Sequence, residues 1–381
     1  MILPLEGVRV IEVGQALAGP LAGAIMADMG ADVIKVEKPD GGDDARGWGP
    51  PFGPDGVTSL YFHGQNRNKR SVTLDLKKPE DVEALHRMCE EADVLIQNLR
   101  PGVVDEIGIG PAAMLGRHPR LVYCSIWAFG ATGPMMMKPG FDPLLQAYGG
   151  MMSVTGRPQD PPTFCGASIN DKATGMFCVI GALGALRRRD ITGKGGLVDT
   201  SLFETAVHWV EGQVNNHLAT GDVPTRHGTG GAVIVPYQVF DCADRPMCLA
   251  AGNDRLWGRC AAVLGHPEWG RDERFSRGAA RVRNKAVLLP MIEQVLKTRP
   301  RDAWITALEA AGVPCAPVND IGEVVASAQF AAVDIVQHLP GGPTVVGLPI
   351  SFDGVRPRSA RGAPKIGEHN EEVLARPGPT G

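Results

Sequence analysis

The amino-acid sequence predicts an α/β fold built on an open, parallel sheet, and three observations carry this prediction. First, residues 8–13 (VRVIEV) form an apolar run typical of a buried strand. Second, a glycine-rich turn, a helical stretch over residues 20–29 and a second strand-like run over residues 31–37 follow it. This is a βαβ unit, in which the crossover makes the two strands parallel. Third, strand and helix patterns keep alternating up to residue 127, which indicates helices on both faces of the sheet.

The remaining elements of this sheet are expected in the first 130 residues. Pro20 suits a helix start, and Gly30 ends the first helix. Further along, the patterns predict a helix followed by two strands, over residues 79–92, 93–97 and 121–127. The Gly- and Pro-rich residues 41–56 are expected to form a long loop, and loops of this length are usually functional or disordered.

The second half of the sequence predicts two long helices and a smaller domain. Residues 171–189 are apolar nearly all round, which indicates a buried helix, and a capping box of Ser201 and Glu204 opens a helix over residues 201–219. A block of mixed strand and helix patterns follows, and the last strand-like pieces are expected to return to the first domain. The predicted domains are a large one over residues 1–219 with 327–381 and a small α+β one over residues 220–326.

The composition argues against several classes of function. The formal net charge is −4 and aromatic residues make up 6% of the chain, so nucleic-acid binding is not expected. No apolar run reaches the roughly 18 residues of a membrane span, and no signal peptide is visible. Eight cysteines without a Cys-x-x-Cys pair indicate buried thiols in a reducing cytoplasm. Glycine (49) and proline (31) together make up about a fifth of the 381 residues, which predicts many turns and loops.

The turn after the first strand is a candidate ligand site. Gly14, Gly19 and Gly23 follow that strand, and Glu37 closes the second one. The arrangement loosely matches a dinucleotide fingerprint, but the spacing is not Gly-x-Gly-x-x-Gly. Three interpretations stay open: a tight turn that permits close packing, a site for an ADP-containing ligand such as coenzyme A, and an NAD site.

Two further stretches carry weaker signals. Residues 68–71 (NKRS), with Asp75 and Lys77, either hold phosphates or form a solvated surface loop. Residues 227–231 (HGTGG) form either a mobile lid whose N–H groups stabilise an oxyanion or a flexible linker. The nine histidines show no metal-binding spacing, so no metal site is expected.

Asp171 stands at the start of the apolar helix, which is an unusual place for a carboxylate. Burial raises the pKa of a carboxyl group, whereas a helix N-terminus favours the anion and lowers that pKa. Asp171 is then either an ordinary N-cap or an ionised carboxylate held ready as a nucleophile. Gly166 and Gly175 flank it and would let a bulky substrate approach the backbone.

Taken in order, a series of motifs resembles the class III CoA-transferase family, to which the formyl-CoA and carnitine CoA-transferases belong. In the first half they are residues 4–12 (PLEGVRVIE), 18–20 (AGP), 30–37 (GADVIKVE), 68–71 (NKRS), 93–98 (DVLIQN), Pro101-Gly102, and Gly166 leading to Asp171. In the second half they are residues 192–196 (TGKGG), Gly252-Asn253-Asp254 with Trp257, 312–314 (GVP) with Pro317-Val318, and 366–369 (IGEH). The resemblance covers nearly the whole chain, and the order and spacing of the motifs make it specific.

The resemblance implies a Rossmann-like large domain built from both chain ends, a smaller α+β domain inserted late, and an interlocked homodimer. It implies a cytoplasmic enzyme with no metal and no permanently bound cofactor, whose substrates are acyl-CoA and carboxylic acids. In such enzymes the aspartate that matches Asp171 attacks the donor acyl-CoA, for which succinyl-CoA is one candidate. A mixed anhydride and then an aspartyl-CoA thioester form, and the acceptor acid finally receives CoA.

The resemblance also implies individual site residues. The expected CoA contacts are Ala16, Ala18, Lys38, Leu74, Lys77, Asn98, Leu99 and Arg100. Beside the nucleophile Asp171, Gly230 and Gly231 are expected to form a lid that keeps water from the anhydride. Leu17, Trp127 and Phe129 stand where the oxalate-using formyl-CoA transferases have polar residues, which favours a larger or less polar acid.

The same superfamily contains the α-methylacyl-CoA racemases, which are the alternative interpretation. They keep the aspartate and add a base histidine in a Gly-His-Asp run, which here reads Gly140-Phe141-Asp142. Racemisation needs a second acid/base across the α-carbon. Phe141 cannot supply one, so a transferase is the preferred interpretation. A nucleotide-binding protein, either non-catalytic or NAD-linked, is the third.

Overall fold

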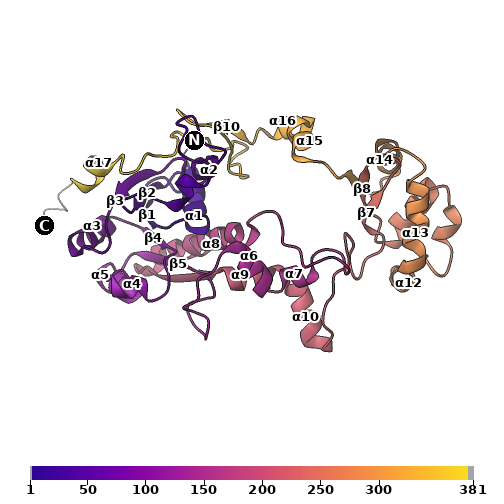
Figure 1. The fold of residues 1–381 in the computed structure, drawn as a ribbon, viewed down its shortest axis with the longest axis horizontal. Coiled ribbons are helices and arrows are strands. Elements are labelled where there is room, and N and C mark those ends of the chain that lie inside the picture. Colours follow the sequence, from indigo (N-terminus) through magenta and orange to yellow (C-terminus); the bar gives the residue numbers. More distant parts are fainter. Residues whose placement is uncertain (1, 376–381) are drawn as a thin grey trace. The chain divides into compact units, whose positions relative to one another are not determined.

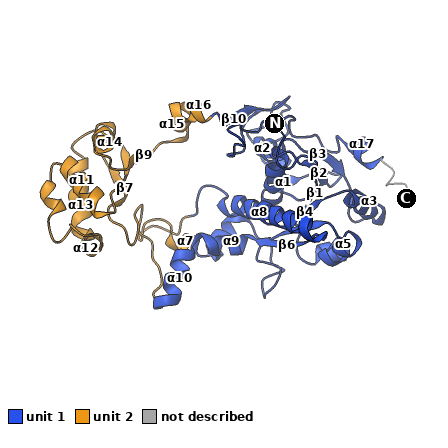
Figure 2. Cartoon of the chain, turned by 180° about the vertical axis from the view of Figure 1, so that it is seen from behind, with its two compact units in different colours: residues 1–151, 164–221, 334–381 blue, residues 152–163, 222–333 orange. Residues whose placement is uncertain are grey.

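The structure, a computed structural model, describes residues 2–375, and the chain divides into two compact units (Figure 2). Unit 1 comprises Met1–Met151, Phe164–Gly221 and Asp334–Gly381, and unit 2 comprises Met152–Thr163 and Asp222–Val333. Each unit has its own hydrophobic core.

Unit 1 is built on a six-stranded parallel sheet in the order β3-β2-β1-β4-β5-β6 (Figure 1). The strands are β1 (Arg9–Val13), β2 (Asp32–Glu37), β3 (Arg70–Thr73), β4 (Val94–Gln97), β5 (Val122–Trp127) and β6 (Gly196–Ser201). The predicted α/β class with a parallel central sheet is confirmed. The strand order reverses between β1 and β4, and ligands of such sheets bind outside the carboxyl ends of the strands at that point.

Helices cover both faces of this sheet. The helices of unit 1 are α1 (Ala18–Asp28), α2 (Leu60–Asn66), α3 (Pro79–Glu90), α4 (Val103–Glu106), α5 (Pro111–Arg117), α6 (Asp142–Tyr148), α8 (Ile169–Thr192), α9 (Leu202–Trp209), α10 (Glu211–Thr220) and α17 (Asn370–Leu374). Because side chains alternate along a strand, Val10 and Val94 pack with α1 and α8, whereas Ile11 and Leu95 pack with α3.

The sequence does not predict strand β3, and neither interpretation of residues 68–71 is correct. Lys69 and Arg70 are buried, although they were expected to face phosphates or solvent. Lys69 Nζ lies 2.6 Å from Glu12 Oε2, and an Arg70 guanidinium nitrogen lies 2.5 Å from Asp32 Oδ2. These charges are satisfied inside the fold and are not free to bind a ligand.

The helix boundaries around the proposed nucleophile also differ from the expected ones. Helix α8 begins two residues early, at Ile169, so Asp171 lies within its first turn and not at its cap. The helix expected over residues 201–219 is two helices, α9 and α10, that meet at Val210.

The C-terminal segment of unit 1 lies along strand β3. The backbone N–H of His369 donates to the carbonyl oxygen of Ser71 over 2.9 Å. The side chain of Asn370 accepts from the Thr73 N–H and donates to the Thr73 hydroxyl, over 2.9 Å each. This segment therefore covers the edge of the sheet, which would otherwise offer unpaired backbone groups. A short hairpin of β10 (Val336–His338) and β11 (Thr344–Val346) precedes it.

Unit 2 combines a small antiparallel sheet with helices. Its strands, in the order β7-β8-β9, are β7 (Tyr237–Asp241), β8 (Pro246–Ala250) and β9 (Cys315–Pro317). Its helices are α11 (Asp254–Val263), α12 (Gly278–Arg283), α13 (Lys285–Leu296), α14 (Arg301–Ala310), α15 (Ile321–Ala326) and α16 (Ala328–Val333), and α7 (Met151–Val154) lies at the boundary with unit 1. Within residues 2–375, no helix is both long and apolar enough to cross a membrane.

Candidate active site

A hollow of about 690 Å³ opens in unit 1 at the carboxyl ends of β1, β4 and β5. The turn after β1, the residues after β4 and the end of β5 form part of its wall. Asp171 reaches it from the first turn of α8, and Tyr61 and Trp48 add aromatic surface. The hollow lies where the strand order reverses, so the nucleophile candidate stands at the place where this sheet type binds ligands.

A second hollow, of about 230 Å³, lies at the carboxyl ends of β1, β2 and β3. Most of its wall is apolar, including Leu74 and Leu99, and Lys38 and Lys77 stand at its rim. Gln15 and Leu99 line both hollows, so the two are neighbours. An apolar slot with lysines beside it suits a flat base that carries phosphates.

The structure brings together nearly all of the residues that the resemblance singled out. Around the first hollow lie Ala16, Ala18, Asn98, Leu99, Arg100 and Asp171, and around the second lie Lys38, Leu74, Lys77 and Leu99. Gly230 and Gly231 belong to unit 2, where they line a separate hollow. Their role as a lid stays a prediction.

The turn after β1 is held in an unusual conformation. Ala16 has a φ of 64°, which non-glycine residues rarely adopt. The side chain of Asn98 accepts a hydrogen bond from the Gln15 N–H and donates one to the Gln15 carbonyl, over 2.9 Å each. Asp43 Oδ1 accepts from the Ala16 N–H over 3.1 Å. The side chains of Asn98 and Asp43 therefore hold the backbone of Gln15 and Ala16, which forms part of the wall of the first hollow.

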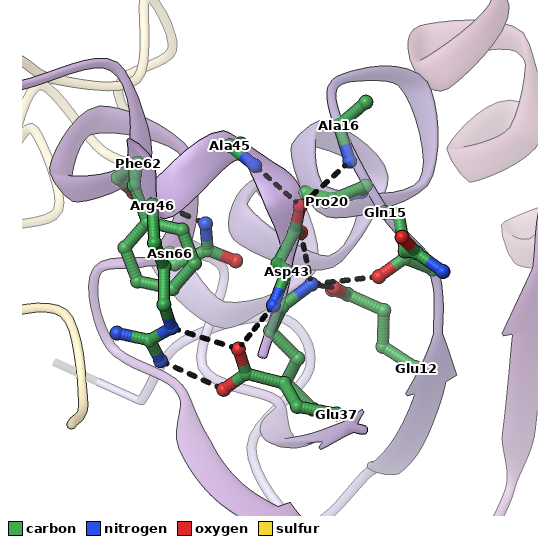
Figure 3. Close-up of polar contacts among 12 residues, drawn as sticks. Glu12, Gln15, Ala16, Pro20, Glu37, Asp43, Ala45, Arg46, Phe62 and Asn66 are labelled. Carbon is green, nitrogen blue, oxygen red and sulfur yellow. Dashed lines mark hydrogen bonds and ion pairs between the residues drawn. The ribbon is translucent and has the colours of Figure 1, made fainter. Parts of the chain in front are cut away.

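Buried charged side chains, among them Glu12 and Asp43, lie beside this turn (Figure 3). Lys35 Nζ lies 2.9 Å from both Glu12 Oε1 and Asp43 Oδ2, and it donates to the Gly14 carbonyl over 2.7 Å. Burial alone would lower the pKa of Lys35, but the carboxylates of Glu12 and Asp43 outweigh burial and raise it. Lys69 bonds to the other oxygen of Glu12. The charges neutralise one another, so this group is a support for the turn and not a ligand site.

In an NAD site, Glu37 would accept a hydrogen bond from a ribose hydroxyl of the nucleotide, and here it is not free to do so. Arg46 binds both of its carboxylate oxygens, over 2.8 and 2.7 Å, and Ser71 Oγ donates to it over 2.6 Å. Burial would raise the pKa of Glu37, but the bonds and charge of Arg46 lower it below its usual value. A carboxylate whose oxygens are already bonded has little capacity left for a ribose hydroxyl.

The Asp171 carboxyl group has a pKa of about 7. Burial is the larger cause, and the negative charge of Asp142 adds to it. The opposing effect of the helix N-terminus does not prevail, since Asp142 accepts the N–H groups of Asn170 and Asp171 over 2.7 and 3.0 Å. Burial also raises the pKa of the nearby Tyr61, so its hydroxyl stays protonated at neutral pH.

Gly175 does not face the hollow, which corrects the expectation that it lets a substrate approach. A Cβ atom at Gly175 would lie only 2.8 Å from the Ala18 carbonyl oxygen. The glycine therefore allows α1 and α8 to pack closely.

Sequence reasoning missed several residues that line this site, among them Trp48, Tyr61 and Asp142. Trp48 and Tyr61 belong to the Gly- and Pro-rich region and to the unpredicted helix α2, where no periodic pattern singled them out. Asp142 is part of the Gly-Phe-Asp run. The sequence analysis used that run only to note that Phe141 stands where the racemases have a histidine. The partners of Asp142 lie 28 and 29 residues further along the chain.

A parallel sheet, a slot suited to a phosphorylated base and a half-buried aspartate in the adjoining hollow fit an enzyme whose substrate carries a nucleotide. The sequence profile of CoA-transferase family III matches residues 5–370. The chain belongs to this family and is a CoA-transferase.

Individual proteins agree with this assignment. The chain is 39% identical to a succinate–glutarate CoA-transferase of Agrobacterium fabrum, over 98% of this chain and 95% of that protein. It is 36% identical to an acetyl-CoA:oxalate CoA-transferase of Acetobacter aceti, over 96% and 93%. The crystal structure of a CAIB/BAIF family protein from Brucella suis superposes with a TM-score of 0.86 at 38% identity, covering 98% and 99%. The racemase alternative is not favoured, because these relatives transfer CoA and the phenyl ring of Phe141 carries no exchangeable proton.

Proposed function

We propose that this enzyme carries CoA between two carboxylic acids through a covalent bond to Asp171. The carboxylate oxygen of Asp171 attacks the thioester carbon of the donor, the C–S bond breaks, and CoA leaves as a thiolate. The product is a mixed anhydride of Asp171 and the donor acid. The observation that carries this proposal is the position of Asp171 in the hollow that adjoins the slot lined by Lys38, Leu74 and Lys77.

In the second step the thiolate moves CoA onto Asp171. The last two steps then run the same exchanges backwards with the acceptor acid in place of the donor acid. The thiolate attacks the Asp171 carbonyl of the anhydride and releases the donor acid, which leaves an aspartyl-CoA thioester. The acceptor carboxylate attacks this thioester and releases the thiolate, and the thiolate then takes the acceptor acyl group and frees Asp171. Each step exchanges one activated acyl bond for another, so no ATP is consumed.

We propose CoA contacts at the walls of both hollows and dicarboxylic acids as substrates. In this proposal Leu74 and Leu99, which line the slot, contact the adenine, Lys38 and Lys77 pair with phosphates, and the Asn98–Arg100 segment contacts the pantetheine arm. Succinyl-CoA as donor and glutarate as acceptor are the first pair to test, since they match the substrates named for the Agrobacterium relative.

We further propose that unit 1 is the CoA-binding domain and that two cytoplasmic chains form an interlocked homodimer. Large apolar side chains stay exposed on α8 and α9 within one chain, among them Met176, Ile180 and Trp209. Large exposed apolar side chains gathered on neighbouring helices are typical of protein–protein interfaces, which supports this proposal. All eight cysteines are free thiols, which suits a reducing compartment.

A substrate screen tests the proposed function. The enzyme is incubated with succinyl-CoA and each of a panel of mono- and dicarboxylic acids, and the CoA esters are identified by mass spectrometry. We expect a new acyl-CoA with glutarate, and none with the Asp171→Asn variant. Loss of the α-proton in deuterated water without any acceptor acid would instead support the racemase.

A further inference from the structure

The start of helix α8 lacks a cap of its own. Ser168 occupies the N-cap position, but its side chain makes no capping hydrogen bond. The first N–H groups of a helix have no partner within the helix, so a buried helix start needs acceptors from elsewhere. Here they are needed at the turn that carries Asp171.

The acceptor comes from a different helix. Asp142, the first residue of α6, is 3% exposed, and its Oδ2 accepts the N–H groups of both Asn170 and Asp171, over 2.7 and 3.0 Å. One carboxylate oxygen thus holds the backbone of the nucleophile and of the residue before it.

Gln146 lies one turn later on α6 and completes the arrangement. Its Nε2 donates to Asp142 Oδ1 over 2.5 Å, which fixes the orientation of that carboxylate. Its Oε1 accepts the N–H of Cys165 over 2.8 Å. The chain from Cys165 to Asp171 is therefore tied at both ends to two neighbouring side chains of α6.

We propose that Asp142 is a positioning residue of the transfer reaction: its carboxylate fixes the backbone of Asp171 at the angle from which the side chain attacks the thioester. This inference rests on the proposed function, because it concerns the same nucleophile. Misplacing a reacting group by about 1 Å costs on the order of 100-fold in rate.

Asp142 also sets the charge environment of the nucleophile. Its negative charge is the second cause, after burial, of the raised pKa of Asp171. The other charged or titratable side chains around the hollow are Tyr61, Asp44, Arg100 and Lys138. Removing the charge of Asp142 should therefore make Asp171 ionise at lower pH, an effect that a purely structural role would not produce.

The test compares Asp142→Asn with the wild type over pH 5–9, using the succinyl-CoA and glutarate assay. We expect kcat to fall about 10- to 100-fold, with KM for succinyl-CoA unchanged within about threefold, because Asp142 does not line the slot proposed for the adenine and the phosphates. The acid limb of the kcat/KM profile should move to lower pH. Asp190→Asn is the matched control, since Asp190 is an exposed aspartate at the other end of the same helix and should leave both quantities unchanged.

An Asp142→Asn variant with wild-type kcat and an unmoved acid limb would overturn the inference while leaving the proposed function intact. If that variant does not fold, Gln146→Met takes its place. It removes the bond to Asp142 but keeps the charge, so kcat should fall at least threefold with no movement of the limb, and a wild-type kcat would count against us. No CoA transfer by the wild type would overturn the proposed function itself.

Discussion

At neutral pH the carboxyl group of Asp171 is only partly ionised, since its pKa is about 7. The proposed chemistry requires the anion, because a protonated carboxyl group is a poor nucleophile. The fold thus holds Asp171 where burial disfavours the carboxylate, which is its reactive form. Ionising Asp171 therefore lowers the stability of the folded protein. Such a conflict between stability and activity is common at active sites.

This conflict predicts how Asp171→Asn changes stability with pH. The wild-type carboxyl group binds its proton more tightly in the folded state, so rising pH destabilises the wild type, from about pH 4 up to about pH 7. The amide does not titrate. The stability of the variant relative to the wild type should therefore rise by about 2–3 kcal/mol between pH 5 and pH 8, as measured by urea unfolding at fixed protein concentration. A difference that stays constant over this range would contradict the raised pKa.

At the scale of elements, the close contact of α1 and α8 sets where the site residues lie. Helix α1 begins with Ala18 at the wall of the hollow, and α8 carries Asp171 to the same wall. Gly175 allows the two helices to approach, because a Cβ atom there would lie 2.8 Å from the Ala18 carbonyl oxygen. The packing of two helices is thereby coupled to the geometry of the site.

Two alanine substitutions at helical glycines separate packing from helix propensity. Gly175→Ala should destabilise the protein by about 1–3 kcal/mol, because the methyl group pushes α1 away, and it should also lower activity. Gly258→Ala in α11 is the control, because it lies outside the face of α8 that the proposed homodimer covers. It should stabilise the protein by about 0.5–1 kcal/mol, since a Cβ atom there meets nothing and alanine favours the helix. Thermal unfolding measures both. Equal effects of the two substitutions would show that the α1–α8 contact is unimportant.

The sequence predicts those elements whose apolar pattern is local. The opening βαβ unit follows from residues 8–37, and the buried character of α8 follows from its composition. Strand β3 escapes prediction because Lys69 and Arg70 are charged, and their burial depends on partners from other segments, such as the carboxylates of Glu12 and Asp32. Asp142 escapes for the same reason, since it caps a helix that begins 27 residues later. Contacts between distant segments leave no periodic signal.

At the scale of the whole molecule, unit 1 alone carries Asp171 and all of the proposed CoA contacts. Unit 2 carries Gly230 and Gly231, whose role as a lid stays a prediction. Apolar side chains on α8 and α9 are exposed in the single chain. The proposed homodimer would cover them with a second copy of the chain, which is the partner that the family resemblance implies.

The homodimer is testable without any substrate. Native mass spectrometry should give twice the mass of one chain, with no monomer down to nanomolar concentration, because interlocked chains have no stable folded monomer. Ile180→Lys should weaken the dimer, since it places a charge in the proposed apolar interface. A stable wild-type monomer would contradict the proposed assembly but not the chemistry at Asp171.

The covalent role of Asp171 is tested most directly by trapping. The enzyme is mixed with succinyl-CoA, quenched with hydroxylamine, digested and mapped by mass spectrometry. We predict a hydroxamate on Asp171 that requires succinyl-CoA, together with an Asp171→Asn variant that folds but transfers no CoA. Transfer at the wild-type rate by that variant, or trapping at a different residue, would contradict the account.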